Sequence, residues 1–208
     1  MLFIVLMVST SVCGTDSMGS NPIKHPNCPY GGMEDTVVLE TTFCRFESCY
    51  GYLNLNTMVY KRLSDGSKVQ LDEYIKEYMT QYEDVDILIG CDSQNFARGT
   101  VYAIVVALYR PGKGAHVLFN RWTAPKEYTR SIRLLNEVWY AIEVAEKLRE
   151  ADVPKVKWID VDLNPDPRYK SNEVFRQAVG MVEGMGYQVR YKTLGPIATY
   201  AADHLVRV

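Results

Sequence analysis

The stretch Asp84–Arg110, DVDILIGCDSQNFARGTVYAIVVALYR, predicts two neighbouring strands of a sheet joined by a short loop. Its first half contains Ile87–Ile89, an unbroken apolar run that is typical of a strand covered on both faces at the centre of a sheet. Asp92 stands at the far end of this strand, just before the loop. A carboxylate there has lost much of its water and needs a hydrogen bond, a counter-charge or a cation. An Asp that simply turns the chain through residues 93–95 is the alternative interpretation.

The composition is that of an ordinary globular protein. The chain has 208 residues, of which 47% are hydrophobic and 23% charged, so it is neither a disordered nor a membrane-spanning sequence. This length accommodates one full domain and an appendage. The net charge of −2 gives no general attraction to nucleic acid, so any such binding must come from a local basic face.

Residues 1–57 are expected to form an irregular leader, either disordered or the product of a misannotated start. They show no sustained period and are dense in Gly, Pro, Asn, Ser and Cys. A secretory signal at Leu2–Val8 is the alternative, but no Lys or Arg precedes this run, which is at the lower length limit for a signal core. The run is also far too short to span a bilayer.

The cysteines allow two interpretations. A zinc site could be assembled from the leader, although its spacing lacks Cys-x-x-Cys pairs. Free thiols in a reducing environment are the simpler interpretation, and they favour a cytoplasmic protein without membrane attachment. The residues of the zinc alternative are His25, Cys28, Cys44 and Cys49.

Residues 58–208 carry the regular patterns of a single domain. Its apolar periods, turns and breakers predict both strands and helices. Strands are expected near 58–63, 87–92, 100–110, 116–123, 155–163 and 187–193. Helices are expected near 71–82 and 131–150, from Ser171 or Asn172 to Gly184 or Gly186, and from Pro196 onwards.

Glu137 is an acid at an apolar position of the helix at 131–150. It falls within the inward stripe of this helix, three residues after Leu134 and four before Ala141. A first-turn Glu favoured by the helix dipole would be the bland explanation, but Glu137 lies beyond the first turn. An inward carboxylate needs a partner, which favours a functional role.

Three further acids occupy informative places. Asp160 and Asp162 share one face of the strand at 155–163, because side chains two residues apart point the same way. Asp162 is nearer the end of that strand. Asp203 lies in the last turns of the closing helix, where the dipole disfavours an anion without a cation. His204 beside it is either a ligand or general acid, or a solvated or capping histidine.

The order of three strands, a helix, a strand, a helix, a strand and a closing helix resembles the ribonuclease H-like fold. The motifs IGCDSQ at 89–94, IDVDLN at 159–164 and ADHL at 202–205 resemble, more closely, the predicted ribonuclease H-related nuclease family typified by YkuK. The resemblance covers about Val59–Val208. It implies an α/β domain with a five-stranded mixed sheet flanked by helices, preceded by the irregular N-terminal leader.

The same resemblance implies an acidic site. Members of the superfamily carry carboxylates at the ends of the first and fourth strands and on the first and closing helices, and the corresponding positions here are Asp92, Asp162, Glu137 and Asp203. Asp160 is a rival for the third place. The loop before the closing helix lacks the histidine of classical ribonucleases H, and the chain lacks the Asp-x-Glu pair of proofreading exonucleases.

Crowded carboxylates stay ionised most easily with divalent cations between them, and hard oxygen ligands suit Mg²⁺ or Mn²⁺. Two such ions about 4 Å apart activate a water and stabilise the departing oxygen of a phosphodiester. The resemblance therefore implies a metal-dependent nuclease acting on RNA, RNA/DNA hybrid or structured DNA. A catalytically inactive nucleic-acid-binding module is the alternative, and an actin-like phosphotransfer domain would need a longer chain.

Polar and basic residues near the expected acidic site are the candidates for substrate contact. The loop after Asp92 supplies two of them, and the second half of the domain supplies the others. Further basic side chains could contact phosphate if they surround the acids, and the oligomeric state is left open. The substrate candidates are Asn95, Arg98, Lys170, Asn172 and Lys192, and the further basic residues are Lys126, Arg130, Arg133 and Arg190.

Overall fold

The computed structural model describes residues 58–154 and 156–207. The expectations for residues 1–57, including the signal and zinc alternatives, lie outside the described residues. Within them, none of the helices combines the length and the apolar character needed to cross a bilayer.

Seven strands form one mixed sheet in the order β2-β1-β5-β4-β3-β6-β7. β3, β4 and β5 form an antiparallel meander, whereas β6 pairs parallel with β3 and β7 parallel with β6. The five strands from β5 to β7 are the predicted mixed sheet, and the short β1 and β2 extend it beyond β5. The strands are β1 Tyr60–Arg62, β2 Lys68–Val69, β3 Asp86–Phe96, β4 Gly99–Arg110, β5 Gly114–Ala124, β6 Trp158–Val161 and β7 Val189–Tyr191.

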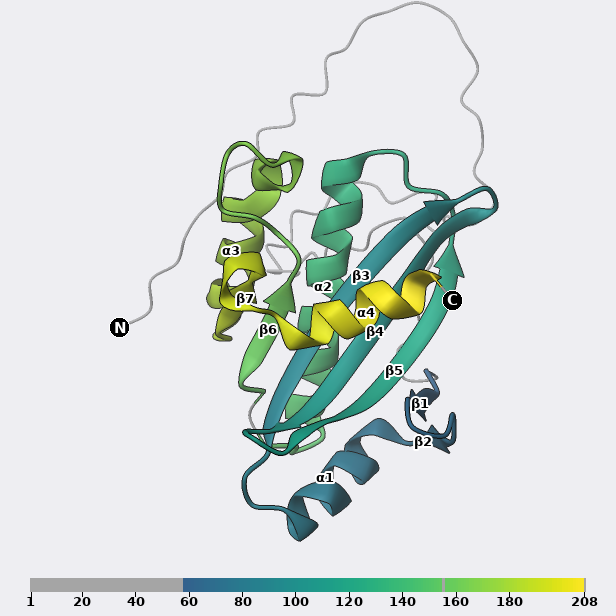
Figure 1. Cartoon of the computed structure of the whole chain (residues 1–208), viewed down its shortest axis with the longest axis vertical. Coiled ribbons are helices and arrows are strands. Elements are labelled where there is room, and N and C mark those ends of the chain that lie inside the picture. Colours follow the sequence, from purple (N-terminus) through teal and green to yellow (C-terminus); the bar gives the residue numbers. More distant parts are fainter. Residues whose placement is uncertain (1–57, 155, 208) are drawn as a thin grey trace, which may run out of the picture. The chain divides into compact units, whose positions relative to one another are not determined.

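Helices cover both faces of this sheet. α1, α2 and α3 contribute to the apolar core on one face, and α4 packs on the other. Figure 1 shows α4 crossing the sheet in front of β3 and β4, with α2 behind it. Pro196 was expected at the first helical position, but α4 begins one residue later. The helices are α1 Leu71–Gln81, α2 Arg130–Glu150, α3 Phe175–Gly184 and α4 Ile197–Arg207, with the 3₁₀ turns η2 Lys170–Val174 and η3 Lys192–Leu194.

The alternation of side chains along β3 assigns its residues to the two faces. Ile89 and Cys91 lie in the core shared with α2, whereas Leu88 packs with α4. Gly90 also faces α4, because a Cβ atom there would lie 2.8 Å from the backbone nitrogen of Thr199. With a period of two, Asp92 therefore points toward the α4 face of the sheet.

The expectation that Asp92 ends its strand was wrong. β3 continues to Phe96, which pairs with Gly99, so only residues 97 and 98 form the hairpin tip. The segment after Asp92 was expected to leave the strand because its first three residues, 93–95, are all polar. A paired strand needs backbone hydrogen bonds rather than apolar side chains, and the side chain of Asn95 bonds with that of Thr100 on β4.

Candidate functional site

The site is organised by the point at which β3 and β6 separate. Their parallel ladder runs through three pairs and ends at Gly90 and Asp160. Asp92 and Asp162 each follow two residues later, so they sit side by side in register just past the last pair. Asp92 points to the α4 face, because two residues complete one strand period along β3, and Asp162 directly follows the last residue of β6. The two strands thus bring two acids together from positions seventy residues apart.

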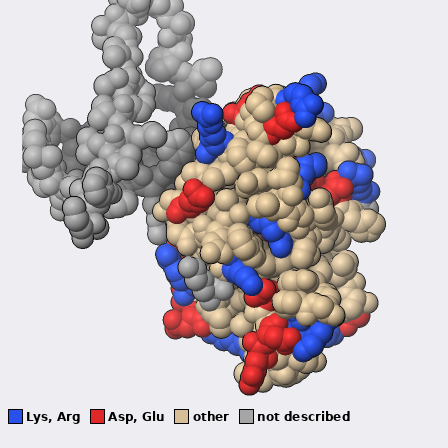
Figure 2. Space-filling view, turned by 60° about the vertical axis from the view of Figure 1, so that its left-hand side comes forward, with Lys and Arg blue, Asp and Glu red and all other residues tan. Residues whose placement is uncertain are grey.

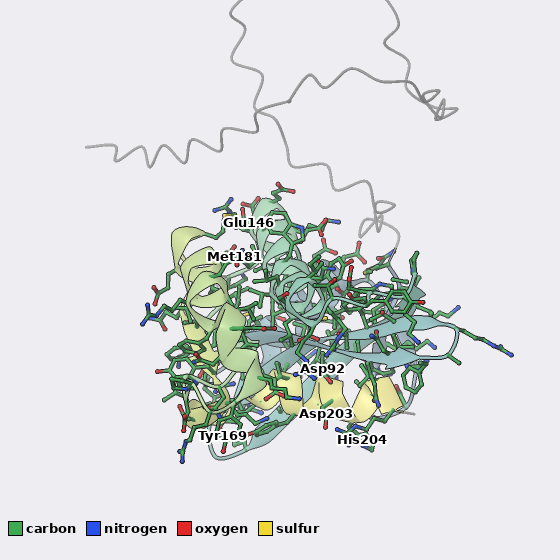
Figure 3. All side chains as sticks on the ribbon, turned by 90° about the horizontal axis from the view of Figure 1, so that it is seen from above. Asp92, Glu146, Tyr169, Met181, Asp203 and His204 are labelled. Carbon is green, nitrogen blue, oxygen red and sulfur yellow. The ribbon has the colours of Figure 1, made fainter. Side chains whose placement is uncertain are left out.

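Asp203 approaches the same place from α4. The pKa of Asp92 is raised to about 7, chiefly by burial and also by the nearby negative charges of Asp203 and Asp162, while a hydrogen bond from the Ser93 backbone acts to lower it. Asp203 is half-exposed and ion-paired with Arg207 one turn along the helix. Figure 3 shows Asp92 and Asp203 next to each other over α4, with His204 further out. Three acids therefore interact on this face.

Glu137 reaches the group from the other face of the sheet. Its side chain is only 4% exposed, and one oxygen accepts hydrogen bonds from the Ser93 hydroxyl and, at 3.0 Å, from Arg133. Burial raises the pKa of Glu137 well above its ordinary value, and the negative charge of Asp92 adds to this effect. Glu137 is therefore coupled electrostatically to Asp92 while Ser93 and Arg133 fix its orientation.

Both carboxylate oxygens of Asp160 accept hydrogen bonds from other groups of the protein. It is 1% exposed, and its oxygens accept hydrogen bonds from Arg190 Nε at 2.9 Å, Arg190 Nη2 at 2.7 Å and the Ala198 backbone nitrogen at 2.7 Å. This carboxylate ties β6 to β7 and to the first turn of α4. Its lone pairs are occupied, so it has little capacity left for a metal ion.

Asp162 has the free capacity that Asp160 lacks. Its Oδ2 accepts a hydrogen bond from Lys192 at 3.4 Å, whereas its Oδ1 is buried and accepts none within the described residues, although the Lys192 nitrogen lies 3.0 Å away. A buried carboxylate oxygen without a hydrogen bond is costly unless a cation satisfies it. Asp162 therefore fits the third position of the acidic group better than Asp160 does.

The donor set suits a hard divalent cation, since Asp and Glu oxygens are the ligands that Mg²⁺ and Mn²⁺ prefer. The buried Oδ1 of Asp162, which has the Lys192 ammonium beside it but accepts no hydrogen bond from described residues, and the raised pKa of Asp92 both indicate a site that favours a positive charge. In the described part of the chain, however, no three His, Cys, Asp or Glu side chains lie close enough together to hold one ion. The four carboxylates are the kind of ligand that such a cation prefers, but the described side chains do not form a complete set of ligands around one ion.

A comparison with protein families gives the relationship of the whole domain. The family model described as ribonuclease H-like matches residues 70–207, which is more than half of the chain. The chain belongs to the ribonuclease H-like family. The matched range contains all four acids of the candidate site, and the described sheet is mixed, as the resemblance implied.

Other comparisons add little to the ribonuclease H-like assignment. A search of the curated proteins finds no match. The crystal structure of prototype foamy virus protease-reverse transcriptase is similar at 11% identity and a TM-score of 0.33, over 59% of this chain and 20% of that one. The chain thus spans a fifth of the length of that viral protein. A likeness at this level carries no argument about activity.

The substrate candidates of this ribonuclease H-like domain divide into two kinds. The amide of Asn95 donates to the Glu127 backbone oxygen, and that of Asn172 donates to the backbone oxygens of Asn164 and Pro165, so both brace loops. Lys192 is paired with Asp162. Arg98 at the hairpin tip and Lys170 in η2 are exposed.

Arg133 and Arg190, which were candidates for phosphate contact, are hydrogen-bonded to buried acidic side chains instead. Arg133 bonds to Glu137 and to Ser93, and Arg190 bonds to Asp160. The first pairing has a sequence signal, because Arg133 precedes Glu137 by one helical turn. No local pattern indicates that Ser93 joins it or that Arg190 reaches Asp160, since both contacts depend on how the strands and helices pack.

Proposed function

We propose that this ribonuclease H-like domain is a divalent-metal-dependent nuclease that hydrolyses phosphodiester bonds. The single observation that carries the proposal is the position of Asp92 where β3 and β6 separate, with the charges of Asp162 and Asp203 both acting on it. Carboxylates brought this close repel one another, and an arrangement that keeps them together is characteristic of cation binding. Glu137 adds a fourth charge from the opposite face.

Asp92, Glu137, Asp162 and Asp203 would hold Mg²⁺ or Mn²⁺. When bound, the ions supply a water activated for attack on phosphorus and a positive charge that stabilises the departing oxygen. We assign no metal role to Asp160, because Arg190 and α4 occupy its oxygens.

The other residues of the site orient the acids. Arg133 and Ser93 hold one oxygen of Glu137, and Arg207 offsets part of the charge of Asp203. Lys192 lies against Asp162 and is drawn to the charge of Asp203, so its pKa is raised, chiefly by the hydrogen bond to Asp162. Its ammonium is placed to meet a substrate phosphate beside these acids.

The proposed substrates are RNA, RNA/DNA hybrid or structured DNA, cleaved by a two-metal mechanism. The motifs at 89–94, 159–164 and 202–205 support placing the chain with the YkuK-type nucleases within the family. The free thiol of Cys91, the one cysteine among the described residues, is consistent with a cytoplasmic location, which we include in the proposal.

A second candidate is a nucleic-acid-binding module of the same fold without turnover. Two observations favour it: Lys192 already neutralises Asp162, and no three acids in the described region stand at metal-holding distance. This candidate predicts binding that weakens with salt and no cleavage product with any metal.

Replacement of Asp92 by Asn tests the nuclease. We expect Asp92→Asn to lower the cleavage rate of labelled RNA, DNA and hybrid substrates in Mg²⁺ or Mn²⁺ by about 100-fold or more, because metal-ion catalysis supplies several kcal/mol. The fold should persist, since burial and neighbouring charges already favour the protonated form of this side chain. Product formation on denaturing gels and circular dichroism give the two measurements.

Glu77→Gln is the matched control, because Glu77 is an exposed acid on α1 that forms no ion pair in the described structure. It should cleave at the wild-type rate. Equal rates for Asp92→Asn and wild type would contradict the nuclease. Measurable affinity of the wild-type chain without any product would select the binding module.

A further inference from the structure

Several basic side chains between residues 126 and 170 have no acidic partner in the described part of the chain. Many described arginines and lysines are ion-paired, but Lys126, Arg130 and Lys170 form no ion pair with any described residue. Lys126 instead lies 5.5 Å from the centre of the Tyr128 ring, which is 83% exposed. Unpaired cations among exposed aromatic rings are typical of surfaces that bind single-stranded nucleic acid.

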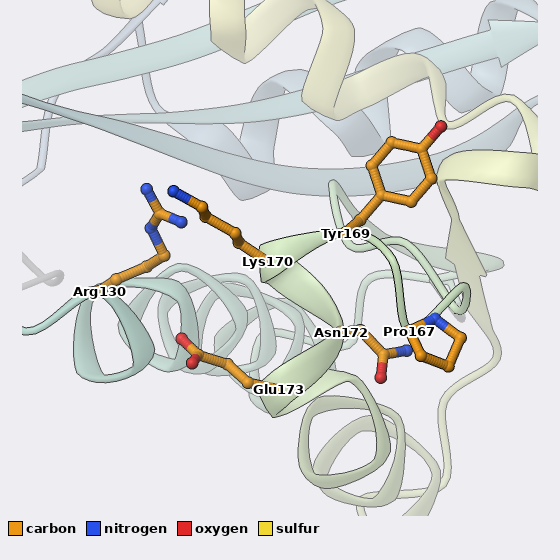
Figure 4. Close-up of a pocket in the computed structure, with 6 residues that line it drawn as sticks. All are labelled: Arg130, Pro167, Tyr169, Lys170, Asn172 and Glu173. Atoms are coloured by element: carbon orange, nitrogen blue, oxygen red, sulfur yellow. The ribbon is translucent and has the colours of Figure 1, made fainter.

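Arg130 and Lys170 line a recess between the start of α2 and η2, with a volume of about 520 Å³. Figure 4 shows the ends of Arg130 and Lys170 next to each other, with the ring of Tyr169 extending in the other direction from the start of η2. Tyr169 is 53% exposed, so a face of its ring is open to solvent. The recess is lined by Arg130, Pro167, Tyr169, Lys170, Asn172 and Glu173.

The lining suits a nucleotide in both size and chemistry. A recess of this volume lies within the range of small-molecule sites. Tyr169 offers a ring on which a base can stack, and Arg130 and Lys170 offer charge-assisted hydrogen bonds to a phosphate. Glu173 is the one acid in the lining and forms no ion pair with described residues, so it leaves both cations available and can accept a hydrogen bond from a base.

The wall of the recess is joined to the acidic site. Asn172 bonds to the backbone oxygens of Asn164 and Pro165, and Asn164 follows Asp162 by two residues. On the other side, Arg130 precedes Glu137 by seven residues of α2, a rise of about 10 Å. A strand with one phosphate in the recess can therefore extend toward the acids.

We propose that this recess binds one unpaired nucleotide of the substrate, with its base on Tyr169 and its phosphate between Arg130 and Lys170. The inference rests on the proposed function and deepens it, because it names single-stranded or frayed nucleic acid as the preferred substrate class. A base within a blunt duplex is already stacked and its face is not accessible to Tyr169.

Binding measured without cleavage tests the recess. Fluorescence anisotropy of labelled single-stranded RNA, single-stranded DNA and a blunt duplex would be recorded with the full chain in EDTA. Tyr169→Ala should weaken single-strand binding by about fivefold or more, the effect of losing one base–aromatic stack. Tyr169→Phe should bind as the wild type does, because it keeps the ring. Arg130→Ala and Lys170→Ala should each weaken single-strand binding, since each removes a phosphate contact.

Two variants away from the recess are the controls. Lys76→Ala removes an exposed cation on α1, and Trp139→Ala removes a ring that is 48% exposed elsewhere on α2. Both should keep wild-type affinity. The recess is overturned if Tyr169→Ala binds single strands as the wild type does, if the controls lose as much, or if the duplex loses equally. Failure of the wild type to bind either single strand overturns it as well.

The outcome separates the two proposals. Single-strand binding that depends on Tyr169, with no cleavage in Mg²⁺ or Mn²⁺, supports the recess and overturns the nuclease. Cleavage that depends on Asp92, together with wild-type single-strand affinity in Tyr169→Ala, supports the nuclease and overturns the proposal for the recess.

Discussion

Two aspartates of one strand segment have opposite surroundings. Asp160 and Asp162 share a face, as their spacing predicts, but Asp160 is enclosed by Arg190 and the first turn of α4 whereas the side chain of Asp162 is 32% exposed. The spacing of two residues predicts the shared face and nothing about partners. Which acid is available for a metal ion is therefore decided by packing.

Replacing each aspartate separates a structural from a functional role. Asp160→Ala should lower the free energy of unfolding by about 3 kcal/mol, because it leaves Arg190, whose side chain is only 14% exposed, without its counter-charge. Asp162→Ala should change it by less than about 1 kcal/mol, since its ion pair with Lys192 is solvent-screened. Urea denaturation followed by circular dichroism measures both.

We expect Mn²⁺ to stabilise the wild type in a thermal shift measurement and Asp162→Ala to abolish this stabilisation. Similar unfolding free energies for the two variants would contradict this division of roles. Retained Mn²⁺ stabilisation in Asp162→Ala would remove Asp162 from the proposed ligands.

At the scale of elements, much of the architecture could be predicted. Apolar alternation and helical stripes indicate the β meander, α1, α2, α4 and the order of strands, and the inward position of Glu137 was confirmed by its burial. The length of β3 and the presence of β2 could not be predicted. A polar paired segment and a strand of two residues leave no periodic signal.

The candidate site was predictable to a smaller extent. The four acids were proposed because their places in the element order match the family, and their role stays a prediction. Their partners were not, because a contact such as Arg190 to Asp160 joins two strands whose pairing is fixed only in the folded sheet. The recess at Tyr169 depends in the same way on the packing of η2 against α2.

The contact of α4 with β3 sets the position of Asp203. Gly90→Ala should destabilise the fold by about 1–3 kcal/mol, because the added Cβ would stand 2.8 Å from the Thr199 backbone nitrogen and 2.9 Å from its methyl group. The same change should lower cleavage, since α4 must shift away from Asp92. Thermal unfolding and the cleavage assay measure the two effects.

Gly180→Ala is the matched control on α3. Nothing lies within 4 Å of a Cβ atom at Gly180, so this change should stabilise the protein by about 0.5–1 kcal/mol through helix propensity. If Gly90→Ala is as stable as wild type, the close approach of α4 does not need glycine and the argument about Asp203 is lost.

At the scale of the whole molecule, charge is balanced overall and uneven locally. The net charge is −2, and Figure 2 shows acidic and basic side chains interspersed over the visible face. General attraction to a polyanion is therefore absent, and binding must depend on local cations such as Lys126, Arg130 and Lys170.

This charge distribution predicts a shallow salt dependence. Three phosphate contacts give a slope of about −2 for the logarithm of the single-strand association constant against the logarithm of salt concentration. Lys170→Ala should reduce the magnitude of the slope by about 0.7, while Lys76→Ala should leave it unchanged. Anisotropy titrations between low and high salt measure it, and a slope near zero would refute binding through these cations.

The hydrogen bonds of Asp160 to Arg190 and Ala198 have a consequence for exchanging strands or helices between related domains. Because one carboxylate joins β6, β7 and the start of α4, the spacing between Asp162 and Asp203 is set by a residue that need never touch a substrate. A graft of β6 alone would import Asp160 without Arg190 and the Ala198 amide that hold it, and a graft of α4 alone would import that amide without Asp160. A domain exchange that keeps these contacts would therefore have to transfer residues 158–207 as one piece.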